Sequence, residues 1–186
     1  MRYYFLITYL PEKRDDNFLA SRFINILHAY SRRYQLHSIG ISFPCWSENS
    51  VGRKIAFVSD ESTALKELFT SESFKLLSEY RVIEISEMLP VLEGGNTEGR
   101  FIHNKCIDKY TAAGKYRIFK RQKKRAMLRG EYSYRPICND KSTFTTRPYH
   151  KIQMSSLSTG QPKFFLNVQV EACETVVEPS FDIYGL

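Results

Sequence analysis

The chain has 186 residues, of which 42% are hydrophobic and 25% are charged, and its net charge is +7 at pH 7. These values are typical of a globular protein with a hydrophobic core, and no apolar run is long enough to span a bilayer. The four cysteines form no C-x-x-C pair, and the N-terminus lacks the long apolar segment of a signal peptide. We therefore expect a cytoplasmic protein with reduced thiols and no zinc ribbon.

The first half of the chain alternates predicted strands and helices in the order βαββαβ. Aromatic and β-branched residues predict strands at residues 3–10, 38–43, 54–59 and 81–86. A helix is expected from the acidic cap at residues 15–17 to about residue 33. A second helix is expected to start at residues 60–62, break near Thr70 and continue to residue 78. This order predicts a ferredoxin-like domain at residues 1–89, which by itself indicates no function.

The second half, residues 90–186, is expected to be a smaller α/β half, so that the whole chain has an α+β fold. A segment rich in glycine and proline at residues 90–99 connects the halves. Residues 100–106 precede the basic helix, and a polar, turn-rich stretch at residues 131–147 follows it. Three short strands are predicted at residues 149–154, 164–170 and 180–184. A hydroxyl-rich loop at residues 155–162 follows the first of these strands.

The positive charge of the chain is concentrated at about residues 109–129. This stretch holds nine Lys and Arg residues and no acid, whereas the rest of the chain has 18 basic and 20 acidic residues. On a helix, five of the cations recur at spacings of three and four residues and share one face: Arg117, Lys120, Arg121, Lys124 and Arg125. Most charged helix faces are only solvated, but a field of one sign favours RNA or another polyanion.

The same stretch has features that would fix it as a helix on the protein. We expect Asp108 to cap its start and Gly130 to end it. Its opposite face is expected to dock against a core through Ala112, Tyr116, Phe119 and Ala126.

No nucleotide-binding loop or metalloenzyme motif is present, and the four histidines lack the spacing of a metal site. A nuclease built on this chain would therefore use the 2′-hydroxyl of RNA as its nucleophile. Such an enzyme needs a proton-transfer group, a hydroxyl to fix the ribose and a cation at the phosphate. His28 lies opposite Leu19 on the first helix and is expected to face away from the core. An exposed helical histidine is usually only solvated, so the residues alone leave its role open.

Several sequence blocks occur in an order known from one family. They are Leu27-His28, S-I-G-I-S-F-P at residues 38–44, the basic helix, S-L-S-T-G-Q at residues 156–161 and Y-G-L at residues 184–186. Over nearly its whole length the chain resembles the type I-F CRISPR repeat-processing endoribonucleases. The resemblance implies an enzyme without metal or cofactor that cuts CRISPR precursor RNA at the 3′ foot of the repeat hairpin. The product would carry a 2′,3′-cyclic phosphate and stay bound, as part of a type I-F interference complex with other subunits.

The resemblance also implies roles for individual residues. His28 matches the catalytic histidine, Ser156 the serine that constrains the 2′-hydroxyl, and Tyr184 the tyrosine that orients the histidine. Phe164 is the best match for an aromatic residue beneath the terminal base pair, and Arg100 matches a guanine-reading arginine. The glutamine that accompanies this arginine in the family is replaced by Ile102. The full set of expected RNA contacts is Arg100, His103, Lys115, Arg117, Lys120, Arg121, Lys124, Arg125, Ser158, Thr159, Gln161 and Phe164.

Two other readings remain open at this stage. The chain could be a non-catalytic RNA-binding module of RRM type, because residues 53–60 match part of an RRM signature at Ala56, Phe57 and Val58. That reading requires aromatic side chains on the outer face of the sheet. The chain could also be a degenerate structural subunit of the family, although His28, Ser156 and Tyr184 are all present.

Overall fold

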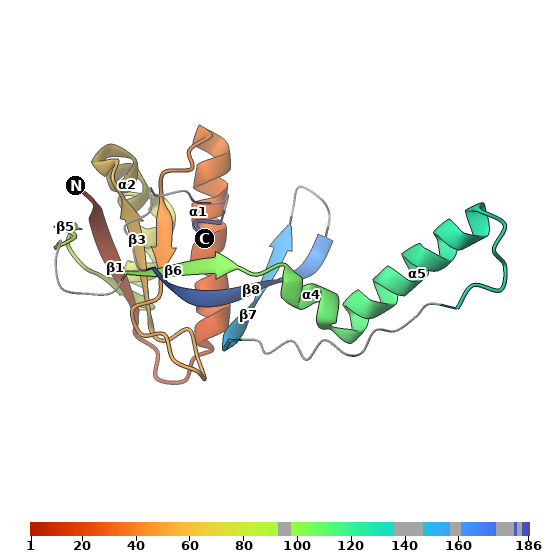
Figure 1. Cartoon of the computed structure of the whole chain (residues 1–186). Coiled ribbons are helices and arrows are strands. Elements are labelled where there is room, and N and C mark those ends of the chain that lie inside the picture. The colour runs from red at the N-terminus through yellow and green to blue at the C-terminus, as the bar shows by residue number, and fades with distance from the viewer. Residues whose placement is uncertain (93–97, 136–146, 157–160, 174–180, 182–183) are drawn as a thin grey trace. The chain divides into compact units, whose positions relative to one another are not determined.

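The sheet in the first half has the strand order that the βαββαβ pattern predicts. In a computed structural model, β1 (Tyr3–Tyr9), β2 (Gly40–Ser42), β3 (Lys54–Ser59) and β4 (Ile83–Ile85) form an antiparallel sheet in the order β2-β3-β1-β4 (Figure 1). This is the ferredoxin-like arrangement within an α+β fold. A short strand that was not predicted, β5 (Leu89–Pro90), also pairs with β1. The structure describes residues 1–92, 98–135, 147–156, 161–173, 181 and 184–186.

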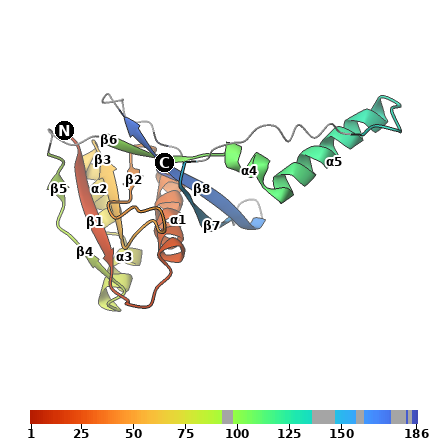
Figure 2. The same ribbon diagram turned by 60° about the horizontal axis from the view of Figure 1, so that its bottom comes forward.

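Three helices pack on one face of this sheet: α1 (Asp16–Tyr34), α2 (Ser62–Phe69) and α3 (Glu72–Glu79) (Figure 2). The expected break near Thr70 lies between α2 and α3. Alternate residues of β1 point toward the helices, so that Phe5 stacks on Phe57 with ring centroids 5.2 Å apart and Tyr9 stacks on Phe23 of α1 at 5.5 Å. All four rings are almost completely buried.

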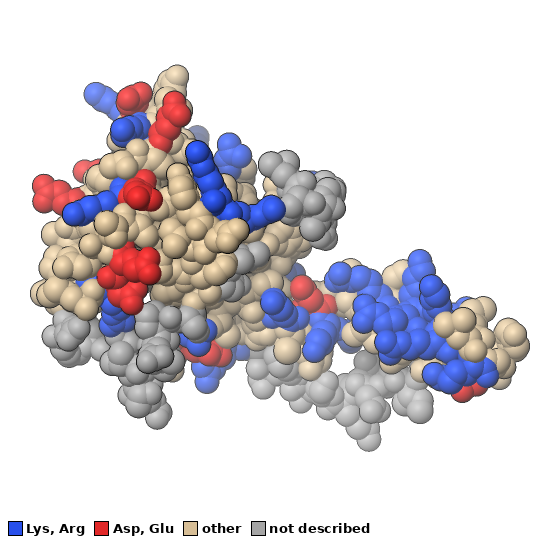
Figure 3. Space-filling view, turned by 90° about the horizontal axis from the view of Figure 1, so that it is seen from above, with Lys and Arg blue, Asp and Glu red and all other residues tan. Residues whose placement is uncertain are grey.

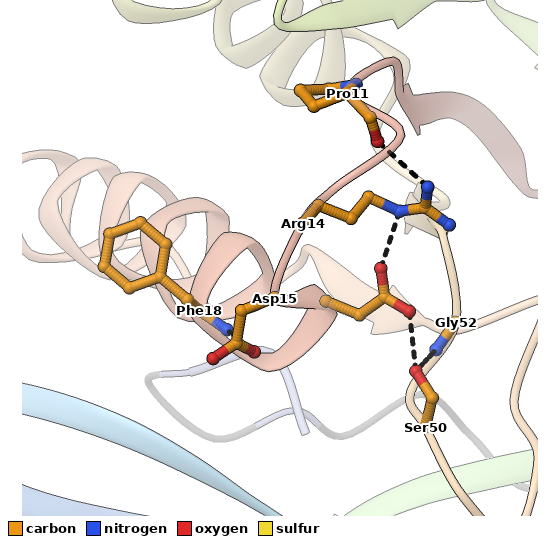
Figure 4. A network of polar contacts seen from close by, with 7 residues as sticks. Pro11, Arg14, Asp15, Phe18, Ser50 and Gly52 are labelled. Atoms are coloured by element: carbon orange, nitrogen blue, oxygen red, sulfur yellow. Dashed lines mark hydrogen bonds and ion pairs between the residues drawn. The ribbon is translucent and has the colours of Figure 1, made fainter.

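A network of hydrogen bonds fixes the start of α1 (Figure 4). Asp15 caps the helix by accepting from the Phe18 amide, as predicted. The Asp16 carboxylate accepts from Arg14 through one oxygen and from the Ser50 hydroxyl through the other. The loop between β2 and β3 is therefore bonded directly to the first turn of α1.

A second antiparallel sheet packs on α1. It has the order β6-β8-β7, with β6 (Glu98–His103), β7 (Tyr149–Ser156) and β8 (Gln161–Cys173). The strand β6 was not predicted, and it ends before Cys106, the first residue of a helix. Ile152 of β7 and Leu166 of β8 are fully buried in the same core as Leu27 of α1, and α1 contacts β7. The strand expected at residues 180–184 lies mostly outside the described residues, and Tyr184 is in a turn.

The basic stretch forms two helices, α4 (Cys106–Tyr110) and α5 (Ala112–Leu128). The predicted cap at Asp108 is wrong, because Asp108 lies inside α4 and Thr111 caps α5 by accepting from the Gly114 amide. Gly130 ends α5 as predicted: its φ is +80°, and its amide donates to the Met127 carbonyl.

The expected docking of the apolar side of α5 is found only in part. Ala126 is fully buried, but Tyr116 is 64% exposed and Phe119 is 39% exposed. A helical wheel identifies an apolar stripe without indicating whether another element covers it.

Contacts among the described residues group the chain into two units. One unit contains Met1–His103 and Pro148–Leu186, and the other contains Asn104–Arg147. The expected division into domains at residues 1–89 and 90–186 stays a prediction. None of the helices in the described part of the chain has the length and apolar character needed to cross a bilayer.

Candidate active site and RNA-binding surface

His28, Tyr184 and Phe164 lie together, although they come from widely separated parts of the chain. His28 is half-buried near the C-terminal end of α1, and its ring stacks on Tyr184 with centroids 4.8 Å apart and 27° between the planes. The Phe164 ring of β8 lies 6.1 Å from the Tyr184 ring. Tyr184 thus contacts both the candidate catalytic histidine and the candidate stacking residue.

The expectation that His28 faces away from the core needs correction. Ser21, on the same side of α1, is only 5% exposed, and His28 itself is half-buried. This side of α1 faces away from the first sheet, but the second sheet packs against it through β7. A wheel drawn for a helix on one sheet could not predict a second contact face.

The last residues of the chain hold Tyr184 in place. Gly185 has a φ of +77°, and its carbonyl accepts a hydrogen bond of 2.7 Å from the Ile41 amide of β2. A Cβ at this position would lie 2.7 Å from Cδ2 of Leu27, the residue before His28. Leu186 is buried. The I-G-I and Y-G-L blocks of the sequence are therefore in direct contact, and this contact sets the position of the Tyr184 turn.

The β-hairpin formed by β7 and β8 carries the candidate serine. Ser156 is the last residue of β7 and pairs with Gln161, and the register shifts between Met154 and Ser156 as in a β-bulge. Bulges re-aim side chains and are frequent beside active sites. The side chains of Ser156 and Gln161 lie outside what the structure describes, as do residues Ser158 and Thr159. Their expected roles stay predictions.

The predicted cationic face is present on α5. Figure 3 shows Lys and Arg gathered on this helix, whereas both signs are mixed over the other unit. All six candidate contacts on α5 are exposed: Lys115, Arg117, Lys120, Arg121, Lys124 and Arg125. At the end of the helix, Arg129 forms a two-point ion pair with Glu131, which lowers the pKa of the Glu131 carboxyl. The other cations of α5 are exposed, so an anionic ligand can reach them.

The two candidates on β6 have different environments. Arg100 is exposed and lies opposite Glu171 of β8 in the register, while His103 is half-buried opposite Val168. An arginine on an exposed strand face can reach a base edge, whereas His103 has less access to a ligand.

The other histidine of the second sheet has a structural role. His150 is 6% exposed, contacts the Trp46 ring and lies 2.8 Å through Nε2 from the Ser47 carbonyl. Since a carbonyl only accepts, Nε2 carries the proton. Among the described residues, no three His, Cys, Asp or Glu side chains lie close enough to hold a metal ion together.

Comparison of the sequence with known protein families gives a match over nearly the whole chain. Residues 4–186 match the family described as CRISPR-associated protein (Cas_Csy4). The chain belongs to this family. Its members are the type I-F endoribonucleases that process CRISPR RNA. A comparison with curated proteins gives no match.

Membership in the Csy4 family agrees with the structure of β3, which lacks the exposed aromatic residue that an RRM has there. Phe57, the aromatic residue of the RRM-like segment, is fully buried against Phe5 on the helix side of the sheet. Its neighbours Ala56 and Val58 point to the other face, as alternation along a strand requires. The RRM reading therefore lacks the exposed aromatic residue that it needs in β3.

This member of the Csy4 family also has a groove that the sequence patterns did not predict. The groove has a volume of about 430 Å³ and lies between the N-terminal half of α1 and the strand β7. Its α1 wall includes Asn17, Ser21 and Asn25, spaced four residues apart on the side that also carries His28. That polar spacing was the only signal in the sequence, and it could equally describe a solvated helix face.

Proposed function

We propose that this chain is a metal-independent endoribonuclease that cleaves CRISPR precursor RNA at the 3′ foot of the repeat hairpin. It then keeps the mature guide RNA as a subunit of a type I-F interference complex. Family membership supports RNA processing in general. The observation that supports cleavage by this chain is the stacking of His28 on Tyr184 at 4.8 Å, with the Phe164 ring 6.1 Å from the same tyrosine.

The proposed reaction needs only one proton-transfer residue and groups that hold the RNA. The 2′-hydroxyl loses its proton, O2′ attacks the adjacent phosphorus, and the P–O5′ bond breaks. The departing O5′ takes up a proton, so the products carry a 2′,3′-cyclic phosphate and a 5′-hydroxyl. His28 takes the proton from the 2′-hydroxyl and gives it to the departing O5′. The stacked Tyr184 ring limits the rotation of the imidazole.

Binding is assigned to other residues. The cationic face of α5 holds the phosphates of the RNA hairpin, since phosphate contacts position a nucleic acid without reading its sequence. Phe164 stacks against the terminal base pair, which would place the scissile phosphate near His28 and Ser156. Arg100 supplies a base contact from β6.

Replacing His28 tests whether the chain cleaves RNA or only binds it. We expect His28→Ala to lower the cleavage rate roughly 10²–10⁴-fold, the usual contribution of acid–base catalysis. Affinity for the RNA hairpin should change little, because the phosphates are held by α5. Single-turnover cleavage of a short repeat hairpin in EDTA, with analysis of the product ends, measures both effects.

His37→Ala is the matched control, because His37 is an exposed histidine just beyond the end of α1. It should cleave at the wild-type rate. A 2′-deoxy substitution at the cleavage position should abolish cleavage by removing the nucleophile. Wild-type cleavage by His28→Ala, or a product with a 3′-hydroxyl, would contradict the proposed mechanism and leave only RNA binding.

A further inference from the structure

Both walls of the groove between α1 and β7 include residues that are close in sequence to the candidate active site. On the α1 wall, Asn25 lies one helical turn before His28. On the other wall, Ser155 immediately precedes Ser156 and lies within the register shift of β7. RNA that leaves the scissile phosphate along these elements would enter the groove directly.

The groove has the chemistry that single-stranded nucleic acid requires. Arg22 of α1 and Lys151 of β7 are exposed cations on its two walls. Phe18 of α1 is 58% exposed and Phe165 of β8 is 46% exposed, so each side also presents an aromatic ring. Proteins that bind single strands combine cations along the backbone with aromatic rings on which bases stack.

The groove contains no competing cluster of negative charge. Asp15 is the one acid in its lining, and this carboxylate already accepts a hydrogen bond from the Phe18 amide at the start of α1. Among the described residues, Arg22 forms no ion pair that would neutralise it. The amides of Asn25 and Gln153 add donors and acceptors that suit base edges.

We propose that this groove binds the single-stranded RNA on the 3′ side of the scissile bond. The proposal rests on the proposed function, because it assumes that the foot of the RNA hairpin lies at His28. With the terminal base pair stacked on Phe164, the strand that continues beyond the cleaved phosphate must leave the helical stem. The groove gives that strand a cationic and aromatic path before cleavage, and the 5′-hydroxyl product leaves along it afterwards.

Binding measurements with uncleavable RNA test the groove separately from catalysis. Three RNAs with a 2′-deoxy group at the cleavage position are compared: the bare hairpin, the hairpin with a 3′ flank of a few nucleotides, and the hairpin with an equal 5′ flank. For the wild-type chain, the 3′ flank should tighten binding roughly tenfold, about the effect of one stacked base. Lys151→Ala and Phe165→Ala should each remove most of this gain and leave affinity for the bare hairpin unchanged.

The control for Arg22→Ala is Arg33→Ala, which removes the same charge from the same helix. Arg33 lines a different groove, which lies between α1 and α2. Only Arg22→Ala should reduce the gain from the 3′ flank. The proposal is overturned if the flank adds no affinity, if the 5′ flank alone adds it, or if the gain survives replacement of Lys151 and Phe165. Failure of the proposed function would appear differently, as an all-ribose hairpin that stays intact in the presence of the wild-type chain.

Discussion

Tyr9 has a buried hydroxyl group in the hydrophobic core. Its side chain is fully buried against Phe23, and no described residue forms a hydrogen bond with its oxygen. Burial, together with the nearby Asp16 charge, raises the pKa of Tyr9 well above its ordinary value. The hydroxyl therefore costs desolvation free energy without a compensating bond.

Tyr9→Phe should leave the free energy of unfolding unchanged or raise it by about 1 kcal/mol. Phenylalanine keeps the shape of the ring and removes the unsatisfied hydroxyl. Because the folded pKa is raised, the unfolded tyrosine ionises first, so wild-type stability falls as the pH rises above about 10. The variant should lose less stability there. Urea unfolding at pH 7 and pH 10.5 measures both effects, and a destabilised variant at pH 7 would show that the hydroxyl has a bonding partner.

Gly185 is the residue on which the position of Tyr184 depends. Gly185→Ala would force a side chain into a backbone with a φ of +77° and against Leu27 of α1. The Tyr184 ring should shift away from His28, and the cleavage rate should fall roughly 10–100-fold, since small displacements in an active site are costly. Single-turnover kinetics measure this fall, while affinity for the RNA hairpin should stay within about twofold.

Gly130→Ala is the control for backbone strain. Gly130 has a φ of +80°, but a Cβ there meets nothing within 4 Å, and it follows α5 rather than the candidate active site. Its substitution should leave the chemical step unchanged. If the two substitutions changed the cleavage rate equally, the Tyr184 turn would have no special role in positioning the ring against His28.

At the scale of elements, α1 shows what sequence periodicity can and cannot predict. Its cap at Asp15 and the buried Phe23 and Leu27 were predictable, because capping and apolar spacing are local properties. Its second contact face was not, because a strand more than a hundred residues later packs against it. The polar residues of that face looked like a solvent-exposed surface in the sequence.

At the junction between α4 and α5, the helix cap is Thr111 and not the predicted Asp108. Thr111 accepts from the Gly114 amide and donates to the Asp108 carbonyl, so one hydroxyl joins the two helices. A Cβ at Gly114 would overlap the Asp108 carbonyl oxygen, which explains why glycine occupies this position. Both Asp108 and Thr111 are good helix caps, and the short helix α4, which contains Asp108, leaves Thr111 as the cap of α5.

At the scale of the whole molecule, charge is divided between a basic helix and a body of mixed sign. Arg121→Glu combined with Lys124→Glu should weaken binding of any RNA hairpin by roughly tenfold or more at low salt. The slope of log affinity against log salt should become shallower by roughly 0.7–0.9 for each phosphate contact that is lost. Filter binding or fluorescence anisotropy across a salt series measures both.

Lys66→Glu combined with Lys75→Glu is the charge-matched control, because these exposed lysines lie on α2 and α3. It changes the net charge equally and should weaken binding much less. Equal losses would show that the RNA responds to the overall charge of the chain rather than to contacts with α5.

For the molecule as a whole, the fold class, the ferredoxin-like strand order and the basic helix were predictable from the sequence. They follow from local patterns and from the order of elements. The pairing of His28 with Tyr184 was expected only from the family resemblance, because no periodicity connects two residues so far apart. The groove beside β7 was not predictable, since its walls come from α1, β7 and β8.

The contact between His28 and Tyr184 has a consequence for biosynthesis. During translation α1 is made well before Tyr184, the aromatic partner of His28. The candidate active site therefore remains incomplete until Tyr184 has been made, and it closes only through a contact of very long sequence separation. A nascent chain can form the ferredoxin-like sheet first and become competent for cleavage only once Tyr184 has left the ribosome.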